Sequence, residues 1–295
     1  MMADGKNKKI AWLYLAPALF LLLVFTFYPL INTFIISLLV DYDFMTGGSF
    51  ERISPIAYIR LLTHPNFRQA MIVTGAIVFI TVPISILLSL IIAVTLNSIK
   101  PFQKIFQTIF FLPYVTNSIA IGMVFAVMFQ TSGGLINTLF GIDVNWIAGG
   151  ASFGTALFVL CVFIIWNSLP FMILILLSGL QNIDKQYYQA AKIDGASKGK
   201  ILRRVTVPLL SPILAFILIT SVMGSFREFT AVIGVFGPNL GPTGHEGRFT
   251  TIVGFVYEFM IERPDYAAAA AVILFMIILF FTAINFWVSK KRVHY

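Results

Sequence analysis

The feature that most constrains this chain is a series of long stretches without charge. The first covers residues 10–40 and contains no Asp, Glu, Lys or Arg. An apolar helix needs roughly 20 residues to cross the hydrocarbon core of a bilayer, and uncharged stretches of that length recur along the chain. Unpaired backbone groups are costly in lipid, and no segment alternates like a barrel strand, so helices are predicted. We predict an all-α membrane protein with six transmembrane helices near residues 12–39, 70–97, 105–130, 152–180, 207–235 and 267–289.

The composition agrees with a lipid bilayer and excludes a water-soluble domain. Hydrophobic residues make up 59% of the chain, charged residues only 11%, and the mean hydropathy is +0.92. Too few charged side chains exist to cover a soluble surface. The net charge of +8 does not indicate a nucleic-acid partner, because the basic residues lie in short connectors between apolar stretches. That placement is typical of a membrane-topology signal.

The basic residues also predict the orientation, since Lys and Arg are retained on the cytoplasmic side during insertion. One side collects 14 of the 20, the other side has five, and Arg227 lies within a span. Both termini are therefore predicted to be cytoplasmic, which agrees with an even number of spans. The predicted cytoplasmic residues are Lys6, Lys8, Lys9, Lys100, Lys104, Lys185, Lys192, Lys198, Lys200, Arg203, Arg204, Lys290, Lys291 and Arg292. The predicted outer residues are Arg52, Arg60, Arg68, Arg248 and Arg263.

The remaining organisation is that of one transmembrane domain over residues 1–295. Three lysines precede residues 10–40, as in a signal peptide, but that stretch is too long for a cleavable hydrophobic region, so we expect an uncleaved first span. Residues 250–260 are apolar and too short to span, and we expect them to lie in the interface or to re-enter partway. Prolines inside the predicted spans are expected to kink them, namely Pro17, Pro29, Pro83, Pro113 and Pro170.

The connector at residues 184–206 has the pattern of a helix, a tight turn and a second helix. Asp184 is expected to cap the first helix and Ser197 the second, and Gly195 permits the left-handed conformation that ends the first. One interpretation is a solvated basic loop that merely obeys the charge rule. The other is a small rigid unit, with two alanines and a glycine at its tip, that enters a groove on a soluble partner.

Residues 188–196, followed by residues 207–212, resemble the EAA loop of binding-protein-dependent ABC permeases. The resemblance implies the fold of a type I ABC importer permease, in which this loop forms a coupling helix, between helices 4 and 5, that sits in a cleft of the ATP-binding subunit. The family usually has a glutamate where Gln189 stands, and glutamine keeps the length and a hydrogen-bonding end. The implied coupling residues are Gln189, Ala190, Ala191, Asp194, Gly195 and Ala196.

The resemblance covers nearly the whole chain from Trp12 onward. Residues 28–30, 110–114, 134–137 and 176–181 are similar to the carbohydrate-uptake permeases, the group that includes the maltose and glycerol-3-phosphate importers. The resemblance implies the first of two paired permease subunits in a bacterial plasma membrane. It also implies the partners: a second permease, two ATP-binding subunits that bind ATP and Mg, an extracellular solute-binding protein, and a sugar as substrate.

Polar residues in two predicted spans are candidates for the substrate path. Ser221, Ser225 and Glu228 follow the spacing i, i+4 and i+7, which places them along one helical face. Asn167, Ser168 and Phe171 lie within about one turn of the preceding span. A neutral sugar needs hydroxyl and amide partners beside an aromatic face. The alternative is that these residues join helices by hydrogen bonds.

Arg227 is adjacent to Glu228, so the two side chains are about 100° apart on a helix and do not simply pair. Arg227 lies about 30 Å along the span from its cytoplasmic start. Snorkelling to the outer headgroups and a gate or cross-subunit ion pair are both left open.

Other chemistry has little support in the sequence. Residues 195–200 are one residue short of a phosphate-binding loop, and Ile201 replaces its hydroxyl, so ATP is expected to bind elsewhere. His64, His245 and His294 are far apart, and Cys161 lies among apolar residues, so no metal site is expected. No catalytic motif is present, so an enzyme is not predicted. The competing hypothesis is a secondary transporter driven by an ion gradient, which would need inverted repeats and buried carboxylates near mid-membrane.

Overall fold

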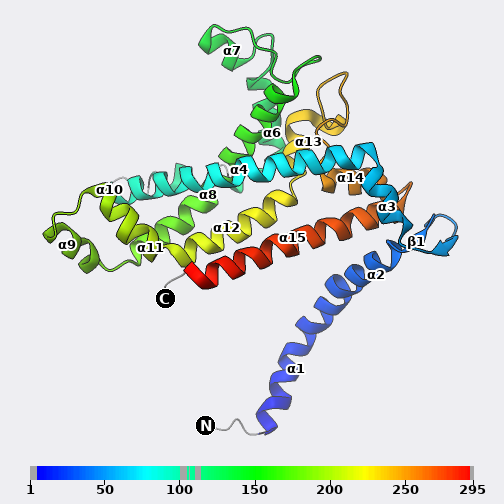
Figure 1. Cartoon of the computed structure of the whole chain (residues 1–295), viewed down its shortest axis with the longest axis horizontal. Helices are drawn as coiled ribbons and strands as arrows, with labels where there is room; N and C mark the ends of the chain where they lie inside the picture. Colours follow the sequence, from blue (N-terminus) through cyan, green and yellow to red (C-terminus); the bar gives the residue numbers. More distant parts are fainter. Residues whose placement is uncertain (1–4, 100–104, 106, 110–113, 293–295) are drawn as a thin grey trace. The chain divides into compact units, whose positions relative to one another are not determined.

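The computed structural model describes residues 5–99, 105, 107–109 and 114–292. Contacts divide the chain into two compact units, one of Met1–Phe67 with Phe255–Phe275 and the other of Arg68–Gly254 with Met276–Tyr295. The unit boundaries fall within the helices α4 (Pro65–Ser98), α14 (Ile252–Phe259) and α15 (Pro264–Arg292). Figure 1 labels the elements of both units, and each unit is described by itself. Lys100, Lys104, Pro113, His294 and residues 110–112 of one predicted motif lie outside the described residues.

Four helices are long and apolar enough to cross a membrane: Ile10–Ile36, Pro65–Ser98, Phe153–Gln181 and Pro264–Val288. They correspond to the predicted spans near residues 12–39, 70–97, 152–180 and 267–289. A fifth candidate is the pair Lys198–Leu209 and Ser211–Phe226, which is bent by 70°. The chain is therefore a mostly helical membrane protein with four or five apolar spans among its described residues.

The first unit contains α1 (Gly5–Leu22), the π-helical turn η1 (Leu23–Phe27), α2 (Tyr28–Ile36), the strands β1 (Leu39–Val40) and β2 (Arg52–Ile53), and α3 (Ile56–Thr63). The strands pair antiparallel, with Leu39 opposite Ile53. Arg263 forms two ion pairs that join the loop after β1 to the start of α15. Its guanidinium lies 3.0 Å from Asp41 in that loop and 3.1 Å from the buried Asp265 in α15. The hydrogen bond to Asp265 raises the pKa of Arg263 above its ordinary value.

The second unit holds the other elements. These are α6 (Ser118–Met128), α7 (Leu135–Phe140), α8 (Phe153–Gln181), α9 (Lys185–Ile193), α10 (Lys198–Ile201), the π-helical turn η3 (Leu202–Thr206), α11 (Val207–Leu209), α12 (Ser211–Phe226), α13 (Thr230–Phe236) and the short 3₁₀ turn η4 (Gly237–Asn239). Residues of α4, α8 and α12 form one apolar core that includes Leu96, Leu176, Leu177 and Ile217.

Within the span predicted near residues 105–130, the helix is interrupted at Asn117. There the backbone is extended, with ψ 120°, and the Asn117 side chain accepts hydrogen bonds from the N–H groups of Ile119 and Ala120. An asparagine that caps a helix in this way competes with continuation of the preceding turn. The apolar helix that follows, α6, has 11 residues.

The span predicted near residues 207–235 is interrupted at two places. The chain bends at Leu210, and α12 ends at Phe226. Beyond it, Phe229 leaves the helical conformation, with φ −147°, and the Glu228 carboxyl group accepts a hydrogen bond of 2.8 Å from the N–H of Ala231 at the start of α13. A polar side chain thus replaces helical backbone bonds at the break.

Two prolines are preceded by wide π-helical turns. Before Pro29 the N–H of Tyr28 donates to the carbonyl of Leu23, and before Pro208 the N–H of Val207 donates to the carbonyl of Leu202. Proline has no N–H, and its ring collides with the carbonyl four residues earlier. The wider turn relieves that collision. Pro17, Pro83 and Pro170 lie inside α1, α4 and α8, where the expected kinks stay a prediction.

Glycines permit two close helix contacts in the second unit. A Cβ on Gly179 of α8 would collide with Ile213 and lie 3.0 Å from Cδ2 of Leu210. A Cβ on Gly122 of α6 would lie 2.6 Å from the Cα of Gly234 in α13. The contact at Gly122 is against backbone and has no room for a larger side chain, whereas at Gly179 the ends of the Ile213 and Leu210 side chains would have to shift.

Gly179→Val should lower stability, because the new methyl groups would force α8 and the start of α12 apart, at a cost of about 1–3 kcal/mol. Gly75→Val is the matched control, since Gly75 is also helical but has no neighbouring atom within 4 Å of its Cβ position. The measurement is the temperature at which half of the purified protein is lost from the monodisperse peak after heating in detergent. Equal temperatures for the two variants would contradict the close packing at Gly179.

Candidate functional site

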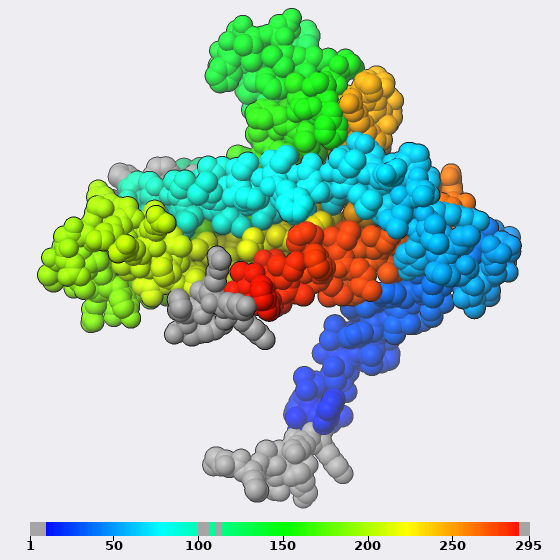
Figure 2. All heavy atoms as spheres, in the orientation of Figure 1, coloured from blue at the N-terminus to red at the C-terminus, as the bar shows by residue number. Residues whose placement is uncertain are grey.

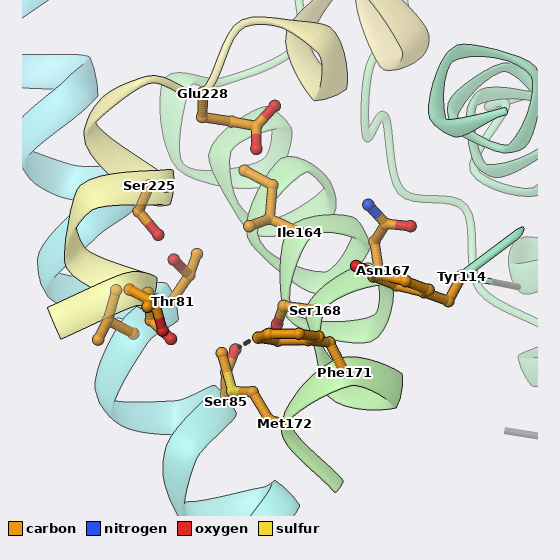
Figure 3. A pocket seen from close by; sticks show the side chains of 14 residues that line it. Thr81, Ser85, Tyr114, Ile164, Asn167, Ser168, Phe171, Met172, Ser225 and Glu228 are labelled. Carbon is orange, nitrogen blue, oxygen red and sulfur yellow. Dashed lines mark hydrogen bonds between the residues drawn. The ribbon is translucent and has the colours of Figure 1, made fainter. Parts of the chain in front are cut away.

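A cavity of about 270 Å³, with several polar residues in its lining, lies between α4, α8 and α12 in the second unit. Figure 3 shows side chains from the three helices pointing toward it. Its lining residues are Thr81, Val82, Ser85, Tyr114, Ile164, Asn167, Ser168, Phe171, Met172, Thr220, Ser221, Gly224, Ser225 and Glu228. Hydroxyl, amide and carboxyl groups thus gather inside a part of the chain that is otherwise strongly apolar.

Hydrogen bonds hold several of these side chains in place. The Ser168 hydroxyl lies 3.0 Å from the Ser85 hydroxyl, across from α8 to α4, and 2.8 Å from the carbonyl of Ile165 (Figure 3). The Asn167 amide donates to Ser118 at the start of α6, at 3.3 Å. A hydroxyl or amide that is already oriented loses little rotational entropy when it binds a ligand.

An aromatic pair borders the same cavity. The rings of Tyr114 and Phe171 are stacked, with their centroids 5.9 Å apart and their planes at 16°. Phe171 retains 36% of its surface exposed. A partly exposed ring next to oriented hydroxyl and amide groups provides both the apolar and the polar contacts that a small polar ligand needs.

All six candidate path residues predicted from the sequence line this one cavity. Sequence reasoning missed Thr81, Ser85, Tyr114 and Thr220. A signal for two of them exists in the sequence, because Thr74, Thr81, Ser85 and Ser89 recur at intervals of seven, four and four along one face of α4. All four are buried. Tyr114 carries no such signal, since the break at Asn117 separates it from α6.

Arg227 does not line the cavity. It is exposed, it ends α12, and it forms no ion pair with any residue that the structure describes. Exposure in the single subunit fits both a snorkelling residue and a gate or cross-subunit ion pair, so the choice between them stays a prediction.

The predicted helix, turn and helix over residues 184–206 are confirmed in their local geometry. Asp184 accepts from the N–H of Gln186 at 2.9 Å, and Ser197 accepts from the N–H of Lys200 at 3.4 Å. Gly195 is left-handed, with φ +66°. The N–H of Gly195 donates to Lys192 and that of Ala196 to Ala191, which together form a Schellman motif. The turn is therefore rigid.

The α9 segment is exposed over most of its length. None of its residues is buried, and Ile193 at its end is 86% exposed. Figure 2 shows this yellow-green segment uncovered at one end of the second unit. The Tyr188 hydroxyl lies 3.4 Å from the buried Thr206 hydroxyl, which joins α9 to the segment that leads into α12.

No group of three or more His, Cys, Asp or Glu residues that could hold a metal is found within the described residues. His64 lies in the first unit, edge-on to the rings of Phe255, Phe259 and Tyr266. Cys161 is buried in α8.

Comparison with known proteins identifies the family. The family of the binding-protein-dependent transport system inner membrane component matches residues 85–294. The chain belongs to this family. As such a permease, it is a multi-pass inner membrane component of an ABC importer and not an enzyme, and ATP binding resides in the partner ATPase subunits.

Several relatives of this permease are similar over nearly their whole length. The chain is 30% identical to the trehalose/maltose transport system permease protein MalF of Thermococcus litoralis, covering 97% of this chain and 96% of the relative. It is 31% identical to the arabinooligosaccharides transport system permease protein AraP of Bacillus subtilis, covering 96% and 90%. It is 29% identical to the lactose transport system permease protein LacF of Rhizobium radiobacter, covering 95% and 94%.

The fold of the permease also matches a solved structure. A chain of a bacterial ABC transporter involved in the import of the acidic polysaccharide alginate is similar with a TM-score of 0.76, at 19% identity, covering 98% of each chain. This likeness shows that the fold is that of an ABC importer permease.

Arg227→Met should leave uptake by the assembled importer near the wild-type rate, because Arg227 has no ionic partner among the described residues and does not line the cavity. Arg263→Met is the contrasting variant, since it removes the ion pairs with Asp41 and Asp265 and should lower the amount of protein in the membrane. Uptake and membrane level are measured together. An Arg227→Met permease that reaches the membrane normally but no longer transports would establish an essential ionic role.

Proposed function

We propose that the chain is one of two paired permease subunits of an ATP-driven importer, and that its cavity between α4, α8 and α12 carries a neutral sugar or oligosaccharide. The observation that supports this most is the lining of that cavity, which combines oriented hydroxyl and amide groups with a stacked aromatic pair. Sugars present hydroxyls around their edges and C–H groups on their faces. Both kinds of surface find a matching partner here.

The printed names of the relatives support the substrate class. Trehalose and maltose, lactose, and arabinooligosaccharides are all neutral sugars. The named sugars differ from one relative to the next, so the relatives support a class of substrate and not one compound. Family membership favours this function over the ion-driven secondary transporter.

The proposed role of residues 184–206 is to dock on an ATPase subunit. Gln189, Ala190, Ala191, Asp194, Gly195 and Ala196 would form the contact, which the exposed α9 and the rigid turn at Gly195 support. The complete importer would then contain a second permease, two ATPase subunits that bind ATP and Mg, and an extracellular solute-binding protein. ATP-driven closure of the ATPase subunits would move the docked loops and turn the cavity inward.

The proposed topology has six spans in one transmembrane domain with both termini cytoplasmic. It counts the four long helices, the bent pair ending at Phe226, and a sixth span that includes α6. The excess of basic residues in the connectors on one side supports the orientation.

Phe171→Ala should reduce uptake by about fivefold, since loss of a stacking face costs about 1 kcal/mol. The chain is co-expressed with the other subunits of its importer, and the complex is reconstituted in liposomes. Uptake of labelled maltose, lactose and arabinobiose is then measured. Phe216→Ala is the matched control, because Phe216 in α12 is half exposed and does not line the cavity. Equal uptake by the two variants would argue against the cavity as the sugar path.

Gly195→Pro should abolish co-purification of the ATPase, because proline cannot adopt φ +66° and lacks the N–H that donates to Lys192. Gly199→Ala is the control in the same loop, at a position with no positive φ and no neighbour near the Cβ position. The measurement is the ratio of ATPase to permease after affinity purification in detergent. An unchanged ratio for Gly195→Pro would exclude docking through this turn.

A further inference from the structure

Glu228 stands apart from the other polar residues of the cavity. Among the described lining residues it is the one with a carboxyl group, and none of them is basic. The remaining polar groups are hydroxyls and the Asn167 amide. Both ion pairs among the described residues belong to Arg263, in the other unit. The Glu228 carboxylate therefore has no counter-ion in the part of the chain that the structure describes.

The local fold fixes where this carboxylate lies. Glu228 occupies the break between α12 and α13, and its side chain accepts a hydrogen bond from the N–H of Ala231 at 2.8 Å. Figure 3 shows it at the same cavity as Ser225, Asn167 and Phe171. Arg227, its neighbour in sequence, is exposed and does not line the cavity, so it does not neutralise the site.

We propose that Glu228 determines the charge of the sugars that pass, so that its carboxylate admits neutral and cationic sugars and disfavours anionic ones. The inference rests on the proposed function, because it takes the cavity as the sugar path. Like charges repel more strongly where protein and lipid replace water than in bulk solvent. Burial disfavours the ionised carboxyl group, and the hydrogen bond from the N–H of Ala231 favours it. Rejection by a repulsive group is a common source of specificity, and the described lining holds no basic side chain that would pair with an anion.

The simplest competing role for Glu228 is structural. Its hydrogen bond to Ala231 starts α13, and a residue in that position stabilises a helix whether or not a ligand binds. Glu228→Gln separates the two roles, because the amide oxygen still accepts from Ala231 while the charge is removed. A purely structural Glu228 would leave the discrimination between charged sugars unchanged in this variant.

The first test uses the unaltered importer and three probes that share one skeleton. The reducing disaccharide that the uptake screen identifies is converted into its neutral alditol, its anionic aldonate and its cationic 1-amino-1-deoxyalditol. Binding to the complete complex in nanodiscs, without the solute-binding protein, is measured by equilibrium dialysis. We expect the aldonate to bind at least about tenfold more weakly than the alditol, which is about 1.4 kcal/mol, and the amine to bind as well as the alditol or better. If the aldonate and the amine both bind more weakly than the alditol, and to the same extent, then the cavity rejects probes by size or the Glu228 carboxyl group is uncharged. Either result would overturn the proposal.

The second test compares Glu228→Gln with Glu262→Gln. Glu262 is exposed in the first unit and does not line the cavity. The ratio of aldonate to alditol dissociation constants should fall by at least about fivefold, roughly 1 kcal/mol, in Glu228→Gln and stay unchanged in Glu262→Gln. An unchanged ratio in Glu228→Gln, or an equal fall in both variants, would overturn the proposal. Failure of the proposed function is recognised separately, because alditol binding would then not depend on Phe171.

Discussion

Inside a membrane, a backbone that leaves the α-helix must find new partners for its N–H and C=O groups, since lipid offers none. This chain meets that constraint with side chains at two of its breaks. Asn117 accepts from two N–H groups at the start of α6, and Glu228 accepts from one at the start of α13. Both breaks adjoin the cavity, because Ser118 bonds Asn167 and Glu228 lines it directly. The polar groups that end the helices are therefore also groups that shape the site.

The sequence predicts the long helices and the local geometry of residues 184–206 well, because the relevant signals are local. Uncharged length identifies four spans, and Asp184, Gly195 and Ser197 each act through neighbouring backbone atoms, as expected. The breaks at Asn117 and Glu228 are not predictable in the same way, since both residues lie in stretches that are apolar enough to span. Whether such a side chain caps a new helix or turns to a neighbour depends on tertiary contacts.

The cavity, too, is only partly predictable from the sequence. The sequence shows polar residues in a pattern on α8 and on α12. Helix packing determines whether these residues meet each other and α4. Gly179 permits the close approach of α8 to the start of α12, and the Ser85–Ser168 contact joins α8 to α4. The fold alone does not fix the cargo: the solved transporter with the same fold is involved in the import of an acidic polysaccharide. Under the proposal for Glu228, charge preference comes from individual side chains that line the cavity.

In the second unit, short segments connect the exposed loop at residues 184–206 to the cavity. The helix α8 carries Asn167, Ser168 and Phe171, and after Gln181 only a short turn separates it from α9. On the other side of α9, Tyr188 contacts Thr206, and the chain passes through Leu210 into α12. Leu210 is fully buried against α8 near Gly179. Close-packed cores transmit displacement instead of absorbing it. A force applied at α9 is therefore expected to move α8 and α12 together relative to α4, and so to change the width of the cavity that the three helices line.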